Sequence, residues 1–296
     1  MLVVVLDSLF ESLDVEREVA ARYGAQVVRL EDDPSLLASA DVVAHVRTRV
    51  DEALIATLSS CRVIARFGTG LDTVDLDAAA RAGIAVVGVR DYCIPELTAH
   101  TLGLAFALVR RLRRLDGLDG GWDDVVRTVP LPGVRTAAVV GLGSIGRAVA
   151  AALAAMGVEV LAVSRTTSLP LDDALAAADL VLLHLALTPE TAGLVDDGRL
   201  EVMRPGAILV DTARLGLLDE AAVAGALESG RLGGLGLDAR LAPDSPLVRF
   251  RGDPRVLVTP HVGWYSEASA RVLRERTIAD ALERALHPRP QEASVT

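Results

Sequence analysis

The chain has 296 residues, of which 51% are hydrophobic, 24% are charged and only 3% are aromatic. This composition excludes a disordered or collagen-like chain, and the length suits one large domain or two of ordinary size. The 40 acidic and 30 basic residues give a formal charge of −10, which disfavours binding to nucleic acid or to an anionic membrane. All of the basic residues are arginine, so chemistry that requires a lysine, such as Schiff-base formation, is excluded.

Neither a disulfide framework, a metal site nor a membrane span is indicated by the sequence. Two cysteines, Cys61 and Cys93, are too few for a disulfide framework or a zinc site and are expected to be buried thiols. The chain begins MLVVVLD without a basic segment or a cleavage site, and no apolar run reaches about 18 residues. We therefore expect a soluble, cytoplasmic protein that holds no metal.

Short apolar runs alternate with alanine-rich amphipathic stretches along the chain, which is typical of β-α units and parallel sheets. In the first third, the pattern predicts strands at 2–6, 26–30, 42–46, 63–67 and 84–89. It predicts helices at 14–23, 51–58 and 76–82. One long helix is then expected at 97–115, ending in the arginine-rich run 110–114, and a loop is expected at 117–133.

A second α/β series begins near Thr136. Its predicted strands are 137–140, 158–163, 180–184, 207–210, 232–237 and 256–259. Its predicted helices are 145–156, 171–177, 220–228 and a long amphipathic helix at 266–286. The whole pattern therefore predicts two α/β series that are joined by one long helix.

The strongest single motif is the glycine-rich turn G-L-G-S-I-G at 141–146, between a predicted strand and a predicted helix. Its first glycine would allow a tight turn, its second would let the backbone approach a pyrophosphate, and its third would let the helix pack on the strand. Free N–H groups at the start of the helix would bind the anion. A purely structural turn is the alternative to the predicted dinucleotide site, which is formed by Gly141, Leu142, Gly143, Ser144, Ile145 and Gly146.

The residues after the next predicted strand favour NADP(H) over NAD(H) as the cofactor. NAD-preferring sites usually place Asp or Glu about 20 residues after the first glycine, where it accepts a hydrogen bond from the ribose 2′-hydroxyl. Here Ser164, Arg165 and Thr166 occupy that place. A planar cation flanked by hydroxyl groups suits a 2′-phosphate instead. The alternative is that Arg165 stacks on the adenine or points into solvent.

Two candidate reacting residues follow predicted strand ends, where open α/β sheets place their ligands. Arg214 ends the segment D-T-A-R, and His261 ends the segment T-P-H. An arginine that binds a carboxylate and a carbonyl, beside a histidine that moves a proton, is the pair that interconversion of a 2-keto acid and a 2-hydroxy acid requires.

Seven segments in this order resemble the D-isomer-specific 2-hydroxyacid dehydrogenase family over essentially the whole chain. They are 66–75 (RFGTGLDTVD), 96–101, 121–122, the glycine-rich turn, 183–191, 211–214 and 259–261. Residues 66–75 and the stretch that begins at His261 are most similar to the C-terminal-binding-protein branch and its bacterial relatives.

This resemblance implies an α/β fold made of two doubly wound parallel-sheet domains. A Rossmann cofactor domain at 93–263 would be inserted in a flavodoxin-like substrate domain made of 1–92 and 264–296. The resemblance further implies a cleft that closes on the substrate, and a homodimer joined through the cofactor domain.

The resemblance also implies roles for single residues. Arg214 would bind the carboxylate and the keto oxygen of a small 2-keto or 2-hydroxy acid. His261 would be the general acid in reduction and the base in oxidation. The implied substrate contacts are His45, Gly68, Thr69, Gly70 and Trp264, and the implied cofactor contacts beyond the glycine turn and residues 164–166 are Thr101, His184, Thr188, Thr212, Ala213 and Asp238. For His45 the alternative is a position in the core, and for Trp264 it is packing between the domains.

One departure from the family pattern concerns the partner of His261. The family normally carries a Glu shortly after the position of Asp238, and its carboxylate would hydrogen-bond the histidine. That interval is shorter here and the Glu is absent, while Asp244 and Glu267 are the nearest carboxylates, at the wrong spacing. Two hypotheses follow: a working reductase whose His261 is held by another group, or an NADP(H)-binding regulatory protein that has lost most turnover. Asp211 also stands where the family usually has Asn.

Overall fold

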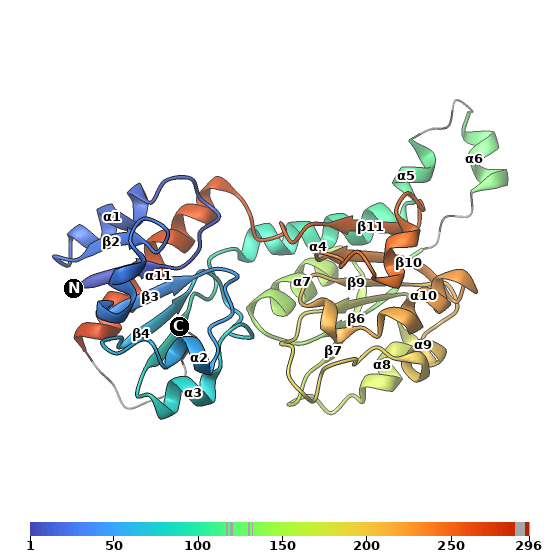
Figure 1. The fold of residues 1–296 in the computed structure, drawn as a ribbon. Coiled ribbons are helices and arrows are strands. Elements are labelled where there is room, and N and C mark those ends of the chain that lie inside the picture. Colours follow the sequence, from blue (N-terminus) through green and yellow to red (C-terminus); the bar gives the residue numbers. More distant parts are fainter. Residues whose placement is uncertain (117, 119–120, 130, 132, 288–293, 296) are drawn as a thin grey trace. The chain divides into compact units, whose positions relative to one another are not determined.

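The computed structural model describes residues 1–116, 118, 121–129, 131, 133–287 and 294–295. The chain divides into two compact units, Met1–Tyr92 with Ser266–Thr296 (unit 1) and Cys93–Tyr265 (unit 2). The second boundary thus falls after residue 265, where the sequence analysis places it after residue 263. Each unit is built on a six-stranded parallel sheet with helices on both faces, which confirms the predicted fold class (Figure 1).

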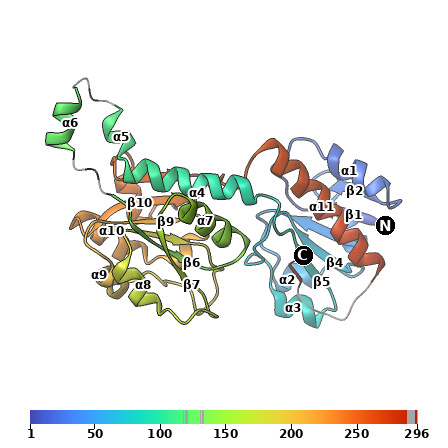
Figure 2. The same cartoon turned by 180° about the vertical axis from the view of Figure 1, so that it is seen from behind.

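The elements of unit 1 are β1 (Leu2–Val5), α1 (Asp14–Ala21), β2 (Gln26–Arg29), a 3₁₀ helix (Pro34–Ser39), β3 (Val42–His45), α2 (Glu52–Ile55), β4 (Val63–Arg66), α3 (Leu76–Arg81), β5 (Ala85–Gly88), α11 (Glu267–Leu286) and β12 (Ser294–Val295). The strand order is β12-β5-β4-β3-β1-β2. The central strands are short valine-rich runs that are buried on both sides, as expected where helices cover both faces. Helices α1 and α11 pack together on one face (Figure 2), and α2 and α3 cover the other.

A buried ion pair holds helix α11 on unit 1. The helix begins with a capping box formed by Ser266 and Ser269. In its second turn, Arg274 donates two hydrogen bonds to the carboxylate of Glu16 on α1, at 2.8 and 2.6 Å. Glu16 has no exposed surface, and the Arg274 guanidinium also lies 4.5 Å from the ring centre of Phe10. The fully paired charge therefore ties the last helix to the first one.

The elements of unit 2 are α4 (Ile94–Val109), α5 (Leu112–Leu115), α6 (Trp122–Thr128), β6 (Thr136–Val140), α7 (Ser144–Ala155), β7 (Glu159–Val163), α8 (Leu171–Ala177), β8 (Leu180–Leu183), α9 (Asp197–Val202), β9 (Ala207–Asp211), α10 (Glu220–Glu228), β10 (Leu232–Asp238) and β11 (Val256–Thr259), with 3₁₀ helices at Leu215–Leu217 and Pro246–Phe250. The strand order is β11-β10-β9-β8-β6-β7. Helices α4 and α7 pack on one face of this sheet, and α8, α9 and α10 cover the other. The strand order reverses between β6 and β8, which is where such sheets bind ligands.

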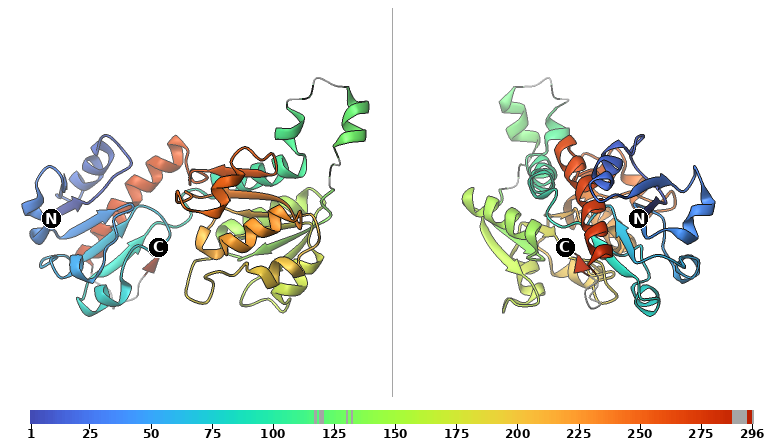
Figure 3. Two further views of the ribbon diagram at one scale, coloured as in Figure 1. Left: turned by 45° about the vertical axis from the view of Figure 1, so that its right-hand side comes forward. Right: turned by 90° about the vertical axis from the view of Figure 1, so that its left-hand side faces the viewer.

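Three helices of unit 2 differ from the predicted ones. The single helix expected at 97–115 is broken into α4 and α5 by Arg111, whose φ is 51°. Like charges three and four positions apart in the run 110–114 disfavour a continuous helix there. The loop expected at 117–133 contains α6, which stands apart from the sheet of unit 2 (Figure 3), while 117, 119–120, 130 and 132 lie outside the described residues. The pattern also misses α9.

The two cysteines are free thiols; Cys93 is buried as predicted, whereas Cys61 is only half-buried. Burial raises the pKa of Cys61 to about 11, so this thiol stays protonated at neutral pH.

In the described part of the chain, no helix combines the length and the apolar character that crossing a bilayer requires.

Replacing Arg274 by Leu should lower the free energy of unfolding of unit 1 by about 3 kcal/mol, because the Glu16 carboxylate would stay buried without its partner. The matched control is Arg271→Leu, since Arg271 bonds Glu275 on the exposed face of the same helix and should change stability by about 0.5 kcal/mol or less. Urea unfolding followed by circular dichroism measures both variants. Equal loss of stability in the two would contradict the anchoring role of Arg274.

Candidate functional site

The predicted site residues of unit 2 lie together at the carboxyl edge of its sheet. Strand pairing places Val140 beside Leu183, Leu183 beside Asp211, and Asp238 beside Thr259. Residues that follow these strand ends therefore share one edge, as the sequence analysis predicts. They are Gly141, His184, Thr212 and His261.

The glycine-rich turn has the geometry that a pyrophosphate needs. Gly141 has a φ of 99°, and a Cβ there would collide with the backbone of His184. A Cβ at Gly146 would collide with the carbonyl oxygen of Gly141, so only glycine allows α7 to approach β6 this closely. At Gly143, by contrast, a Cβ would meet nothing within 4 Å, and no side chain caps the N-terminus of α7. Open space in front of free N–H groups fits a bound phosphate.

Exposed polar side chains follow β7. Ser164 accepts a hydrogen bond from the N–H of Thr166 at 3.2 Å, and the two hydroxyl groups lie 3.0 Å apart. Between them Arg165 is exposed. A hydrogen bond from Thr188 lowers the pKa of Glu190, and the charge of Arg165 contributes to this shift. Arg165 is thus a cation near the glycine turn with one carboxylate in its vicinity.

His184 forms part of the wall of the glycine turn. Its Nε2 atom is buried, and no hydrogen-bond partner reaches it among the described residues. Burial lowers the pKa of His184 to about 4, so the ring is neutral at physiological pH. Thr188 is exposed in a turn that its N–H closes by donating to Thr191 Oγ1 at 2.8 Å. The structure therefore places Thr188 where a ligand can reach it and keeps the His184 ring largely inside.

A backbone carbonyl holds the imidazole of His261. The Nδ1 atom lies 3.1 Å from the carbonyl oxygen of Asp238, and a carbonyl can only accept, so Nδ1 carries the proton. The exposed ring thus keeps Nε2 available for proton transfer. No carboxylate in the described part of the chain forms an ion pair with His261, and Asp244 of the same unit is not a partner. Because the group that holds His261 is a backbone carbonyl, no residue type in the sequence identifies it.

The Asp238 side chain anchors the segment that carries His261. Its Oδ1 accepts hydrogen bonds from the Thr259 hydroxyl at 2.7 Å and from the N–H of Val262 at 2.8 Å. Its Oδ2 accepts from the N–H of Gly263 at 2.7 Å. The carboxylate is 3% exposed, so these three donors compensate a buried charge. This structural role adds to the predicted contact between Asp238 and the cofactor, which stays a prediction.

Trp264 and His100 contact the same segment. The Trp264 indole Nε1 donates to the carbonyl oxygen of His261 at 3.2 Å. On α4, His100 Nε2 lies 2.8 Å from the Thr259 hydroxyl and 3.7 Å from Asp238 Oδ1. The sequence analysis does not single out His100, although its signal is a polar side chain within the family-like segment 96–101.

Arg214 begins a turn that a second buried carboxylate holds. Asp211 Oδ1 accepts from the N–H groups of Ala213 at 2.7 Å and of Arg214 at 3.2 Å. In the described residues, no hydrogen-bond partner reaches its buried Oδ2. Burial raises the pKa of Asp211 to about 7, so near neutral pH this side chain is partly protonated, which makes it resemble the Asn usual in the family.

Thr101 and Thr212, two of the predicted cofactor contacts, are buried in unit 2. Their hydroxyl oxygens lie 2.8 Å apart, and Thr101 donates to the carbonyl oxygen of Leu97 at 2.8 Å. Thr101 is 0% exposed and Thr212 is 4% exposed. The pair ties α4 to the end of β9, so the predicted direct contact of Thr101 with a cofactor finds no exposed surface here.

In unit 1, the predicted residues lie at the end of β3 and after β4. Gly68 has a φ of 136°, and a Cβ there would collide with the guanidinium of Arg66, which the sequence analysis does not consider. The Thr69 hydroxyl donates to the carbonyl oxygen of Val89 at 2.8 Å, which fixes the loop that leads to Gly70.

The structure places His45 in the core of unit 1, not on its surface. His45 is 0% exposed, and its Nδ1 lies 2.9 Å from the carbonyl oxygen of Thr48. Burial, together with the nearby charge of Arg66, lowers the pKa of His45 to about 4. Of the two alternatives for His45, the geometry therefore favours the core position over the substrate contact.

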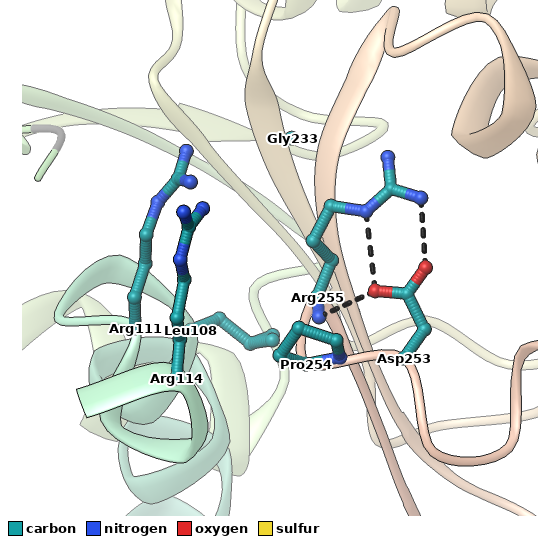
Figure 4. A pocket seen from close by; sticks show the side chains of 7 residues that line it. All are labelled: Leu108, Arg111, Arg114, Gly233, Asp253, Pro254 and Arg255. Atoms are coloured by element: carbon teal, nitrogen blue, oxygen red, sulfur yellow. Dashed lines mark hydrogen bonds and ion pairs between the residues drawn. The ribbon is translucent and has the colours of Figure 1, made fainter. Parts of the chain in front are cut away.

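A cavity of about 360 Å³ lies at the opposite edge of the unit 2 sheet (Figure 4). Arg255 binds Asp253 with two hydrogen bonds of 3.2 and 2.7 Å, and Arg111 and Arg114 lie side by side across the hollow. Gly233 and Arg255 stand at the amino ends of β10 and β11, so this cavity is separate from the predicted site.

In the described ranges, no cluster of His, Cys, Asp and Glu could hold a metal ion.

Known proteins resemble this chain in sequence and in fold. A family model described as "D-isomer specific 2-hydroxyacid dehydrogenase, NAD binding domain" matches residues 102–263. The chain is 36% identical to the D-3-phosphoglycerate dehydrogenase of Mycobacterium leprae over 95% of this chain and 55% of that protein, so it spans about half the length of that relative. It is 33% identical to the glycerate dehydrogenase of Methylorubrum extorquens over 79% of each chain. A solved pyruvate reductase of Chlamydomonas reinhardtii is 27% identical, with a TM-score of 0.76 over 97% of this chain and 96% of that one.

Replacing Asp211 by Asn should stabilise the protein more at pH 8 than at pH 5. The pKa of Asp211 is raised from 3.8 to about 7, so the folded state holds a proton that the unfolded state has released. Wild-type stability therefore falls as pH rises from about 4 to 7, by about 4 kcal/mol at most from this group. Thermal unfolding at the two pH values measures the effect, with the exposed Asp244→Asn as control. The same gain at both pH values would contradict the buried, titrating carboxyl.

Proposed function

Because the chain belongs to the D-isomer-specific 2-hydroxyacid dehydrogenase family, we propose that it interconverts a small 2-keto acid and its D-2-hydroxy acid with NAD(P)(H). The observation that carries this proposal is the His261 segment, in which Nδ1 is bonded to a carbonyl and Nε2 is free for proton transfer. The relatives named above support it, because each is named for a small hydroxy or keto acid.

The residues have separate roles in this reaction. When bound, the nicotinamide supplies or accepts the hydride. His261 Nε2 gives a proton to the keto oxygen in reduction and takes it from the hydroxyl in oxidation. Arg214 binds the carboxylate and polarises the keto oxygen. The Asp238 carbonyl accepts from Nδ1 in both protonation states of the ring, so it replaces the orienting function of the missing Glu.

The glycine turn and the exposed groups after β7 would hold the cofactor. Gly143 and the N-terminus of α7 suit its pyrophosphate. Arg165, with the hydroxyl groups of Ser164 and Thr166, supports a preference for NADP(H) over NAD(H).

Further proposals rest on the family resemblance and on the net charge of −10. They are a homodimer joined through unit 2, a cytoplasmic location, and the absence of nucleic-acid and membrane partners. Sedimentation equilibrium tests the dimer.

A second candidate function is an NADP(H)-binding regulatory protein with little turnover. The observation that favours it is the missing carboxylate partner of His261, because a neutral carbonyl stabilises a protonated ring less than a carboxylate does.

Purified protein should oxidise NADPH in the presence of at least one 2-keto acid from a panel of glyoxylate, hydroxypyruvate and branched 2-keto acids. Arg214→Ala should lower kcat by about 10²–10³-fold, because it removes the group that stabilises the developing negative charge. The Kd for NADPH, measured by fluorescence titration, should not change. Arg240→Ala, which removes an exposed charge from the same unit, is the control. The regulatory hypothesis predicts NADPH binding with equal, residual turnover in all three proteins.

Replacing Arg165 by Asp should shift cofactor preference toward NADH. A charge-assisted contact to the 2′-phosphate contributes about 1.5–3 kcal/mol, so the ratio of NADPH to NADH affinity should fall by about 10- to 100-fold. Fluorescence titration with each cofactor measures the ratio. Arg251→Asp, which makes the same charge change near the opposite edge of the sheet, should leave the ratio unchanged. An unchanged ratio in Arg165→Asp would refute the 2′-phosphate contact.

A further inference from the structure

We propose that His100 is a positioning residue for His261, which acts through Thr259 and Asp238 without touching substrate or cofactor. The proposal rests on the proposed function, in which His261 transfers the proton. It starts from three contacts between α4, the end of β10, the end of β11 and the residue His261 that follows β11.

The hydrogen bonds between these residues have a defined direction. The Thr259 hydroxyl has one proton, and at 2.7 Å it donates to Asp238 Oδ1, which also receives the N–H of Val262. His100 Nε2, 2.8 Å from the same hydroxyl oxygen, must then be the donor to it. A competing acceptor for the Thr259 proton is the Leu237 carbonyl at 3.2 Å. The bond from His100 occupies a lone pair of the hydroxyl and so favours the arrangement in which its proton points to Asp238.

Asp238 in turn holds His261 in a conformation that needs support. His261 has a φ of 62°, in the left-handed region, which costs a non-glycine residue roughly 1–2 kcal/mol. The N–H bonds from Val262 and Gly263 to the Asp238 carboxylate fix the backbone directly after it. The Asp238 carbonyl then meets Nδ1 of the ring.

His100 also supports the segment by packing. A Cβ added at Gly263 would lie 2.9 Å from the His100 ring carbon Cδ2 and 2.9 Å from Asp238 Oδ2. The backbone at Gly263 therefore rests directly on the imidazole and the carboxylate. Loss of the donor should let the Thr259 proton turn toward Leu237, which weakens one of the bonds to Asp238 and loosens the ring of His261.

Two substitutions separate the hydrogen bond from the packing. His100→Leu keeps a similar volume and removes the donor, whereas His100→Gln can place an N–H donor near the position of Nε2. We expect kcat for the 2-keto acid to fall by about 10²-fold in His100→Leu, as a loosened catalytic group would cause, with KM and the NADPH Kd little changed. His100→Gln should recover most of the loss. His287→Leu, which removes an exposed histidine from unit 1, is the matched control.

A second readout needs no turnover. The chain has two tryptophans, and Trp264 donates to the carbonyl of His261. With Trp122 replaced by Phe, tryptophan fluorescence therefore reports on this segment alone. In that background, His100→Leu should raise the acrylamide quenching constant of Trp264, and His100→Gln should not. The pair Thr259→Val and Thr259→Ser should behave like the Leu and Gln variants, which keeps the test open if His100→Leu does not fold.

The outcomes separate the two proposals. If wild-type protein turns over no 2-keto acid, the proposed function fails, and the Trp264 readout still decides the role of His100. Wild-type kcat and quenching in His100→Leu would overturn the positioning role. Equal loss in His100→Leu and His100→Gln would also overturn it, because packing and not the donated bond would then be responsible.

Discussion

The buried carboxylate of Asp238 must be compensated by donors, and all three of them come from the last residue of β11 and the segment that follows it. An uncompensated buried charge would cost several kcal/mol, so this requirement constrains the backbone from Thr259 to Gly263. The same residue offers its main-chain carbonyl to the ring of His261. One position at the end of β10 thus fixes both the path of the segment and the orientation of the side chain that it carries.

The carboxyl group of Asp211, at the end of the neighbouring strand, is not fully compensated by donors. Its donors reach one oxygen only, and burial raises its pKa to about 7. The turn that carries Arg214 is therefore held by a side chain whose charge changes near neutral pH. Both turns are thus positioned by carboxyl groups at adjacent strand ends, but only the one at Asp211 has an oxygen left without a partner in the described residues.

The sequence predicts those parts of the site that depend on strand ends and glycines. Apolar runs stop at Val140, Val210 and Thr259, and this pattern alone is enough to place the residues beyond them at one sheet edge. The partner of His261 could not be predicted, because a backbone carbonyl leaves no residue type to recognise. His100 and Thr259 are 159 positions apart, and nothing local links them. The break at Arg111 and helix α6 depend on conformations that the apolar periodicity does not report.

Replacing an orienting carboxylate by a carbonyl changes what the rest of the site must supply. A bond from the ring to a charged acceptor is roughly twice as strong as one to a neutral acceptor, so the carbonyl orients the imidazole with less energy. The remaining rigidity has to come from the backbone, which here is held through Asp238, Val262 and Gly263. That network does not change its charge when the ring gains or loses a proton, so the position of Nε2 can stay the same in both directions of the reaction. The loss of one side chain is thus compatible with proton transfer because the support has moved from a side chain to the main chain.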